Sequence, residues 1–216
     1  MDTDDRIARV DDVAELAAAL DRLGVRRGRP VLALVGGAGG MSPAESERVR
    51  DLLRELLPAL AARGAAVVDG GTDVGVMRVI GDLADGLPLV GVVAEGALGD
   101  TALEPHHVHV FVPGEAWGDE SPWLAKAVSV LADGSPSVTL LVNGGDITYT
   151  DAAHSIEHGR PVVVLADTGR TADAIAAAAG GVSSDHRAVA IAGSGLTRVV
   201  TAEDFVAVVE SALDPR

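Results

Sequence analysis

The stretch that decides the fold of this chain is Val67-Val68-Asp69-Gly70-Gly71-Thr72-Asp73-Val74-Gly75-Val76-Met77. Its β-branched residues predict a short strand that ends at a double glycine, and an apolar helical pattern begins after the Thr-Asp pair. The glycines let the backbone turn and expose its N–H groups, and a helix N-terminus adds partial positive charge. The stretch therefore suits a phosphate or another anionic group. The alternative is a plain βα turn, in which glycine serves only the bend.

Composition bounds the class of protein. With 216 residues, 48% of them hydrophobic, the chain can bury the core of one domain. It has no cysteine, which excludes disulfides, thiolate metal sites and a cysteine nucleophile. A formal net charge of −15 would repel a nucleic-acid polymer or an anionic membrane surface. The first residues are acidic and no apolar run reaches membrane-spanning length, so we expect a cytoplasmic protein without membrane insertion, with residues 1–5 disordered.

Strands alternate with helices along almost the whole chain. Continuous apolar runs are typical of parallel strands buried on both faces; together with an alternating run, they predict strands at 31–35, 66–69, 89–93, 108–112, 138–142 and 162–165, and a short one at 189–192. Helical spacing predicts helices at 8–24, 43–63, 75–84, 123–132, 146–158, 171–179 and 202–213. This pattern predicts one α/β domain over residues 1–216, a Rossmann-like, doubly wound, mostly parallel sheet with helices on both faces.

Several of these strands end in glycines. The strand at 31–35 runs into a glycine-rich loop, 36–40, and then into Ser42-Pro43-Ala44-Glu45, a capping box with proline at the first helical position. The loop is not G-x-G-x-x-G and lacks a Walker lysine. Because the carboxyl ends of parallel strands meet at one edge of a sheet, the glycines predict a backbone-lined cleft there. The glycines that follow the other strands are Gly70, Gly71, Gly144, Gly145 and Gly169.

Three patterns suggest other chemistry and are set aside. The segment 154–158 matches the zinc-protease pattern H-x-x-E-H, but no third ligand is evident. The triplet Asp167-Thr168-Gly169 matches aspartic proteases, whose chemistry needs two aspartates in a β-rich fold. His106, His107 and His109 could cluster, but histidines in loops are usually solvated. We therefore expect no metal site.

Taken together, the motifs resemble the SLOG superfamily of Rossmann-like nucleotide-ligand sensors. The similarity covers roughly residues 30–180 and is closest to the LSDAT group, the branch in the N-terminal region of melastatin-type TRP channels with its prokaryotic relatives. The strongest marks are Gly71-Thr72-Asp73-Val74-Gly75-Val76-Met77 and Asp167-Thr168-Gly169-Arg170-Thr171-Ala172-Asp173. The resemblance implies a site at the glycine edge for nucleotide-derived ligands related to ADP-ribose or NAD. We expect a bound nucleotide, phosphate or sulfate there. It also implies a homo-oligomer, of which a dimer is one form.

More distantly, the chain resembles the LOG phosphoribohydrolases, which cleave a nucleoside monophosphate with an arginine and the glutamate of P-G-G-x-G-T-x-x-E. In the matching stretch Thr148 is kept and Asp151 stands at the glutamate position, but the proline and the third glycine are missing. LOG proteins carry the arginine on the preceding helix, where residues 121–133 hold only Lys126 as a basic residue. This departure argues against the hydrolase reaction, because a bidentate arginine is lost.

Three hypotheses remain open. The glycine edges favour a ligand-binding or sensing module without strong catalysis, in which Arg170 pairs with phosphate and Glu95 either accepts from a ribose hydroxyl or is merely solvated. The second is an N-glycosidic hydrolase with Asp151 as acid/base. The third is a structural or partner-binding domain, with the loop around Trp117 and Trp123 as its interface; both could instead pack over the cleft as core or lid. The expected ligand-binding residues are Gly36, Gly37, Gly39, Gly40, Gly70, Gly71, Thr72, Gly75, Val76, Met77, Glu95, Asn143, Gly144, Gly145, Thr148, Asp167, Gly169 and Arg170.

Two glycines of the opening stretch carry a sharper expectation. A side chain at Gly71 would block the approach of a ligand and force a residue with a Cβ to positive φ. We expect Gly75 in the first helical turn, where it leaves room for the ligand. Gly75→Ala should then keep or raise the melting temperature while weakening binding. If Gly75 serves helix packing instead, the same substitution should lower the melting temperature first.

Overall fold

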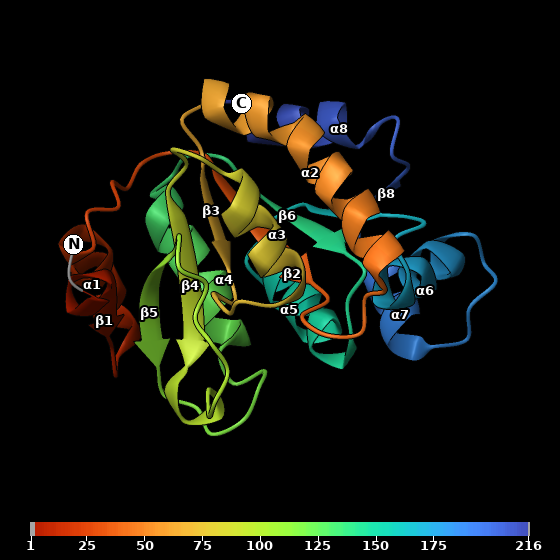
Figure 1. Cartoon of the computed structure of the whole chain (residues 1–216). Coiled ribbons are helices and arrows are strands. Elements are labelled where there is room, and N and C mark those ends of the chain that lie inside the picture. The colour runs from red at the N-terminus through yellow and green to blue at the C-terminus, as the bar shows by residue number, and fades with distance from the viewer. Residues whose placement is uncertain (1–2, 216) are drawn as a thin grey trace.

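Residues 3–215 are described by a computed structural model, shown in Figure 1. They form one eight-stranded sheet in the order β1-β5-β4-β3-β2-β6-β7-β8, with all neighbouring strands parallel. The strands are β1 (Ile7–Arg9), β2 (Val31–Gly36), β3 (Ala66–Asp69), β4 (Leu89–Ala94), β5 (Val108–Val112), β6 (Ser137–Val142), β7 (Val162–Leu165) and β8 (Thr197–Val200). The α-helices are α1 (Leu16–Arg22), α2 (Pro43–Ala62), α3 (Gly75–Leu83), α4 (Ser121–Ala132), α5 (Asp146–Glu157), α6 (Arg170–Ala179), α7 (His186–Ala192) and α8 (Phe205–Leu213).

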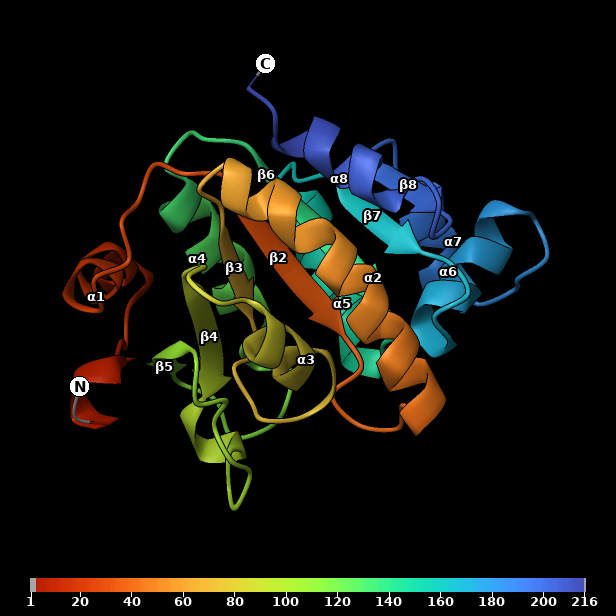
Figure 2. The same ribbon diagram turned by 45° about the horizontal axis from the view of Figure 1, so that its top comes forward.

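Helices cover both faces of the sheet (Figures 1 and 2). α2, α3 and α8 bury side chains such as Leu53, Ile80 and Phe205 against one face. α1, α4, α5, α6 and α7 pack on the other face, where Leu20 and Leu131 are fully buried. Because aromatic residues make up only 2% of the chain, valine, leucine and alanine fill both layers. The predicted α/β fold, with helices on both faces, is confirmed.

Chain order reverses between β2 and β6. From β2 the chain passes through β3 and β4 to β5, and then returns to β6 on the other side of β2. The two strands pair from Val31 opposite Ser137 to Gly36 opposite Val142. The helices that follow them, α2 and α5, lie on opposite faces of the sheet. Such a reversal opens a crevice beyond the carboxyl ends of the two strands, where open α/β sheets bind ligands.

The N-terminal segment differs from the prediction. Residues 8–24 were expected to form one helix, but Ile7–Arg9 form strand β1, Val13–Glu15 form a 3-10 helix, and α1 begins only at Leu16. Residues 7–9 pair with the open edge of β5, which satisfies their backbone hydrogen bonds; the helical spacing of the apolar residues gives no sign of this partner. Disorder was expected over residues 1–5, yet Thr3–Arg6 form another 3-10 helix; residues 1 and 2 lie outside the described part.

The prediction near the C-terminus was also wrong in one place. Residues 189–192, expected as a strand, belong to α7, and the strand of this region is β8, beside β7. The side chain of Asp185 caps α7 by accepting from the backbone N–H of Arg187 at 2.9 Å. This cap favours a helix over the short apolar run.

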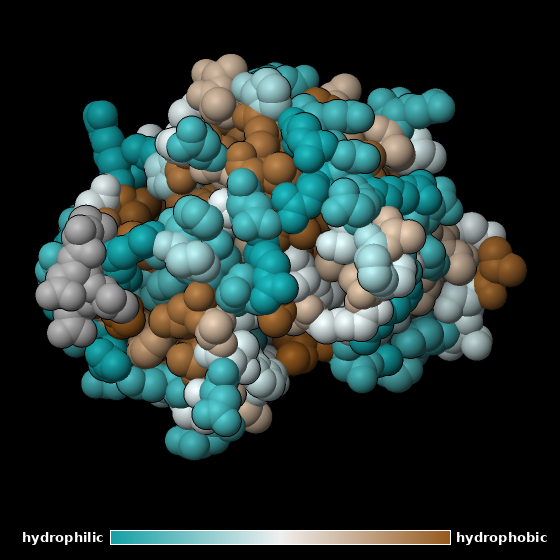
Figure 3. All heavy atoms as spheres, in the orientation of Figure 1, coloured by the Kyte–Doolittle hydropathy of each residue, from teal (hydrophilic) through white to brown (hydrophobic). Residues whose placement is uncertain are grey.

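The surface of the molecule is mainly polar. Hydrophilic residues predominate on the face drawn in Figure 3, with apolar ones in small groups between them. No helix within residues 3–215 has both the length and the apolar character needed to cross a membrane.

Candidate functional site

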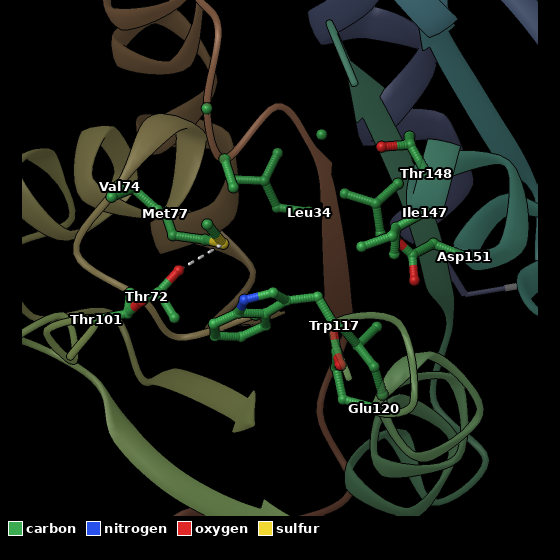
Figure 4. Close-up of a pocket in the computed structure, with 16 residues that line it drawn as sticks. Leu34, Thr72, Val74, Met77, Thr101, Trp117, Glu120, Ile147, Thr148 and Asp151 are labelled. Atoms are coloured by element: carbon green, nitrogen blue, oxygen red, sulfur yellow. Dashed lines mark hydrogen bonds between the residues drawn. The ribbon is translucent and has the colours of Figure 1, made fainter. Parts of the chain in front are cut away.

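A pocket of about 370 Å³ lies beyond the carboxyl end of β2, at the reversal of chain order. Its walls come from five places: the end of β2 with its glycine loop, the turn between β3 and α3 with the start of α3, the loop between β4 and β5, α4 with the segment before it, and the start of α5. Figure 4 shows Val74, Met77 and Thr72 on one side, Ile147 and Asp151 on the other, and the indole of Trp117 between them. The lining residues are Leu34, Val35, Gly36, Ala38, Gly39, Gly70, Thr72, Val74, Met77, Thr101, Trp117, Glu120, Leu124, Ile147, Thr148 and Asp151.

The glycine loop is built by close contact between the ends of β2 and β6. A Cβ on Gly36 would overlap the carbonyl oxygen of Val142, and a Cβ on Gly37 would overlap Oδ1 of Asn143. By contrast, no atom lies within 4 Å of a Cβ placed on Gly39. The first two glycines are therefore required for packing, whereas a side chain at Gly39 would meet no neighbour.

Two features anchor the far side of this loop. Ser42 and Glu45 form the predicted capping box, with the Ser42 N–H donating to Glu45 Oε2 at 2.7 Å. Nη1 of Arg170, the first residue of α6, donates to the carbonyl oxygen of Gly39 at 2.8 Å. This places a guanidinium group directly behind the loop, although Arg170 does not line the pocket.

The turn after β3 is shaped by packing between strands. Gly71 has φ +65°, and a Cβ there would lie 2.6 Å from the α-carbon of Gly91 in β4. Asp69 Oδ1 accepts the N–H of Gly71 at 2.8 Å, which holds the turn closed. The positive φ agrees with expectation, but the group that approaches Gly71 is the backbone of β4, and Gly71 is outside the pocket lining.

A buried charged network supports this turn from behind. His107 is enclosed between two carboxylates, with Nε2 2.9 Å from Asp69 Oδ2 and Nδ1 2.5 Å from Glu104 Oε2. Burial alone would lower the pKa of His107, but Asp69 and Glu104 outweigh it and raise the pKa to about 9. His109 is also buried, and its Nε2 lies 3.0 Å from the carbonyl oxygen of Gly71.

The expectation of solvated histidines was therefore wrong for His107 and His109. Only His106 is largely exposed, with Nδ1 2.8 Å from Glu104 Oε1. Within residues 3–215, no cluster of three or more histidine, aspartate or glutamate side chains has a geometry suited to a metal ion.

The loop after β6 serves as an internal brace. Asn143 has φ +58°, its Nδ2 donates to the Thr168 carbonyl at 2.7 Å, and its Oδ1 accepts from the N–H of Gly144 at 2.9 Å. The N–H of Gly145 donates to Thr148 Oγ1 at 3.0 Å. The N–H groups of Gly144 and Gly145 therefore donate within the protein and are not free to bind a ligand.

Two carboxylates stand at one end of the pocket. Asp151 Oδ1 accepts from the hydroxyl of Ser121 at 2.6 Å, and Glu120 Oε2 accepts from the N–H of Gly118 at 2.9 Å. Burial raises the pKa of Asp151 to about 6; the bond from Ser121 opposes this shift and the charge of Glu120 adds to it. Burial also raises the pKa of Glu120. Raised carboxyl pKa values inside a cleft are typical of functional sites.

The family model described as "SLOG in TRPM, prokaryote" matches residues 29–210 of the chain. The chain belongs to this family. The match covers the glycine loop, both strands at the reversal of chain order and every residue that lines the pocket. The resemblance deduced from the sequence is thereby confirmed.

Two solved structures share the fold of this SLOG chain. The molybdenum cofactor binding protein from the phototrophic bacterium Rippkaea orientalis is 12% identical, with a TM-score of 0.58 over 86% of this chain and 98% of that one. The molybdenum cofactor carrier protein from Chlamydomonas reinhardtii is 20% identical, with a TM-score of 0.58 over the same shares of the two chains. At these identities the likeness concerns the fold alone. No curated protein matches the chain significantly.

The structure of this SLOG chain brings together only part of the predicted site. The predicted residues that line the pocket are Gly36, Gly39, Gly70, Thr72, Met77, Thr148 and Asp151. Those that do not are Gly37, Gly40, Gly71, Gly75, Val76, Glu95, Asn143, Gly144, Gly145, Asp167, Gly169 and Arg170. Glu95 forms an exposed ion pair with Arg9 at 2.8 Å, which corresponds to the solvated alternative.

Several residues that line the pocket were not predicted from the sequence. Trp117 was assigned to an interface or a lid, and Glu120, Thr101, Leu124 and Ile147 were not considered. Trp117 is 42% exposed, as expected of a lid, whereas Trp123, a residue of α4, packs against the core. The segment before α4 has no regular periodicity, but its three acidic residues close to a tryptophan and a helix start were a usable signal.

Proposed function

We propose that this chain binds a nucleotide-derived small molecule in the pocket beyond β2, with ADP-ribose- and NAD-related molecules as first candidates. The position at the reversal of chain order is the usual one for ligands in this architecture. The volume, about 370 Å³, falls within the range of about 300–1,000 Å³ typical of small-molecule sites. The family match adds weight, because the SLOG resemblance implies ligands of this class.

The observation that carries this proposal is the pairing of a glycine loop with an exposed indole across one cavity. Ala38 and Gly39 present a loop that is open to the pocket, with the guanidinium of Arg170 behind it, which suits a phosphate group. Trp117, on the segment before α4, offers a flat apolar face for a planar ring. A nucleotide has one group for each of these places.

Isothermal titration against AMP, ADP-ribose, NAD and cyclic nucleotides tests the proposal. Heat and a rise in melting temperature are expected with at least one of them. Arg170→Gln should weaken a phosphate-bearing ligand about tenfold but leave the matching nucleoside unaffected. Arg198→Gln, on the exposed part of β8, removes the same charge away from the pocket and is the matched control. No binding of any of these compounds would rule the proposal out.

The names of the two structural neighbours suggest one further compound for this panel. Both are described as binding or carrying the molybdenum cofactor, which also joins a ring system to a phosphate. If the chain binds that cofactor more tightly than any nucleotide, the proposed function changes from nucleotide sensing to carrying the cofactor.

A second candidate function is hydrolysis of an N-glycosidic bond, which the carboxylate pair favours. Asp151 has a raised pKa and lies close enough to Glu120 to feel its charge, an arrangement suited to one proton donor and one stabilising anion. Against it, Lys126 is the only basic residue of α4 and does not line the pocket. Release of free base from nucleoside monophosphates, lost in Asp151→Asn, would establish this reaction.

We also infer a homo-oligomer from the family resemblance. Light scattering would measure the mass in solution, and a monomer at micromolar concentration would contradict the inference. A partner-binding role through Trp117 is the remaining alternative, and it is separated from ligand binding by the tryptophan variants described in the Discussion.

A further inference from the structure

The side chains around the pocket carry negative charge without a basic partner. Glu120 and Asp151 are the only ionisable residues among those that line it in the described part of the chain. Glu120 is only 8% exposed, although it borders the cavity. Figure 4 shows Asp151 and Glu120 on the side of the pocket away from Thr72, with the side chain of Trp117 lying between Thr72 and Asp151. The part of the pocket that is lined by Glu120 and Asp151 therefore carries negative charge.

Each acid has one oxygen to spare. Glu120 Oε2 is used by the N–H of Gly118, and Asp151 Oδ1 by the hydroxyl of Ser121. Over residues 3–215, no other residue donates to Glu120 Oε1 or to Asp151 Oδ2. Half-buried and buried carboxylates that lack a cation raise the free energy of the folded protein. A ligand that brings positive charge to this end removes that penalty on binding.

The glycine loop has the reverse preference. The amides of the glycine loop and the guanidinium of Arg170 favour a phosphate near Gly39. The face of an indole attracts a cation as well as an apolar ring, so Trp117 and the two acids favour the same group. The pocket is thus suited to a molecule with an anionic phosphate at one end and a cationic aromatic ring at the other.

We infer that the pocket selects nucleotides whose base is a positively charged aromatic ring, as in the oxidised nicotinamide nucleotides, and that Glu120 and Asp151 are the residues that make this selection. The ring lies between Trp117 and the carboxylates, and the phosphate lies on the glycine loop. This inference rests on the proposed nucleotide binding and narrows it, because adenine and reduced nicotinamide are neutral and leave both carboxylates without a cation.

Four mononucleotides test the inference on the unmodified protein. Nicotinamide mononucleotide should bind at least about tenfold more tightly than its reduced form, from which it differs mainly by the ring charge. AMP should resemble the reduced form. Nicotinic acid mononucleotide should also bind weakly, because its added carboxylate faces Glu120 and Asp151. Comparison with oxidised NAD then shows whether the natural source of the ring is a mononucleotide or a dinucleotide.

Charge-neutralising variants identify the residues responsible. Glu120→Gln should weaken the binding of nicotinamide mononucleotide about tenfold, while the affinity for AMP should change by less than about threefold. Glu115→Gln, on the exposed part of the same segment, removes an equal charge outside the pocket and should change neither. Asp151→Asn keeps the acceptor for Ser121 and gives an independent second test. Melting curves of all three variants check that they are folded.

The outcomes are separable. Equal affinity for the oxidised and reduced mononucleotides would overturn the inference but leave nucleotide binding intact. An equal loss of affinity for nicotinamide mononucleotide in Glu120→Gln and Glu115→Gln would also overturn the inference and leave nucleotide binding intact, because the effect would then follow from the net charge of the protein. Absence of binding by every nucleotide would overturn both this inference and the proposed function.

Discussion

Gly75 at the start of α3 packs against the carbonyl oxygen of Gly37 in the glycine loop, so closely that a Cβ at position 75 would overlap that oxygen. The same Cβ would lie 2.6 Å from the carbonyl oxygen of Ala38. The next residue, Val76, donates its N–H to Gly37 at 3.1 Å. Gly37 and Gly75 lie 38 positions apart in the sequence (75 − 37), and their contact joins two separate glycine motifs beside the pocket.

Gly75→Ala should therefore destabilise the protein. Gly75 has φ +55°, so an alanine is strained there in addition to the overlap, and we expect a loss of about 2–5 kcal/mol. For a chain of this length the melting temperature should fall by about 5 °C or more. This reverses the expectation from sequence that alanine would be harmless to stability in the first helical turn.

Gly39→Ala is the matched control in the same region. No atom lies within 4 Å of its Cβ position and its φ is not in the left-handed range, so the melting temperature should be unchanged. Calorimetric melting of both variants distinguishes the two roles. An unchanged melting temperature in Gly75→Ala would mean that the loop can shift to accept a side chain.

The sheet could be predicted from sequence because its central strands are buried on both faces. Short apolar runs such as 31–35 and 162–165, which lie between glycine-rich turns, predict buried parallel strands. β1 could not be predicted, because three residues at an edge carry too little pattern and depend on β5 for their partners. In α7 the apolar run at 189–192 is helical, because the side chain of Asp185 caps the N-terminus of the helix.

The candidate site could be predicted only in part, for a different reason. Glycine after a strand indicates a bend, but which amides remain free depends on side chains from elsewhere. Asn143 uses its own side chain to hold the N–H of Gly144, and sequence gave no sign of this. The bond between Ser121 and Asp151 joins residues 30 apart, in two helices whose relative placement follows only from the sheet order.

His107 should be a major contributor to stability at neutral pH. Its pKa is raised to about 9 from 6.5, so its contribution is complete below about pH 6.5 and is lost as the pH rises through about 9. His107→Gln leaves Asp69 and Glu104 buried without a cation and should cost about 3 kcal/mol or more. Urea unfolding should show that the difference from wild type is larger at pH 6 than at pH 9.5.

The exposed residue His186 provides the control, because His186→Gln should change stability by less than about 0.5 kcal/mol. A difference between wild type and His107→Gln that stays constant from pH 6 to pH 9.5 would contradict a charged His107 and leave only a packing role.

Asp151→Asn should stabilise the protein while impairing its function. The folded pKa of Asp151, about 6, lies above its ordinary value of 3.8, so ionisation weakens the folded state increasingly as the pH rises through this interval. The neutral variant avoids this penalty, and we expect a gain of about 1–2 kcal/mol at pH 8 that disappears below about pH 4. Asp100→Asn, at an exposed position, should give no gain. Melting across pH 4–8 makes the comparison, and a loss of stability at pH 8 would show that the carboxylate is favourably solvated.

Trp117→Ala should separate the ligand role of this residue from an interface role. Because Trp117 is 42% exposed and borders the pocket, its removal should leave the melting temperature within about 2 °C of wild type. Loss of stacking should weaken nucleotide binding by about 5- to 100-fold. Trp123 packs against the core, so Trp123→Ala should instead lower the melting temperature by several degrees with little change in the affinity of the folded protein. Light scattering decides the remaining question: an unchanged mass in Trp117→Ala supports the lid, whereas dissociation of an oligomer with intact affinity would assign this tryptophan to a subunit interface.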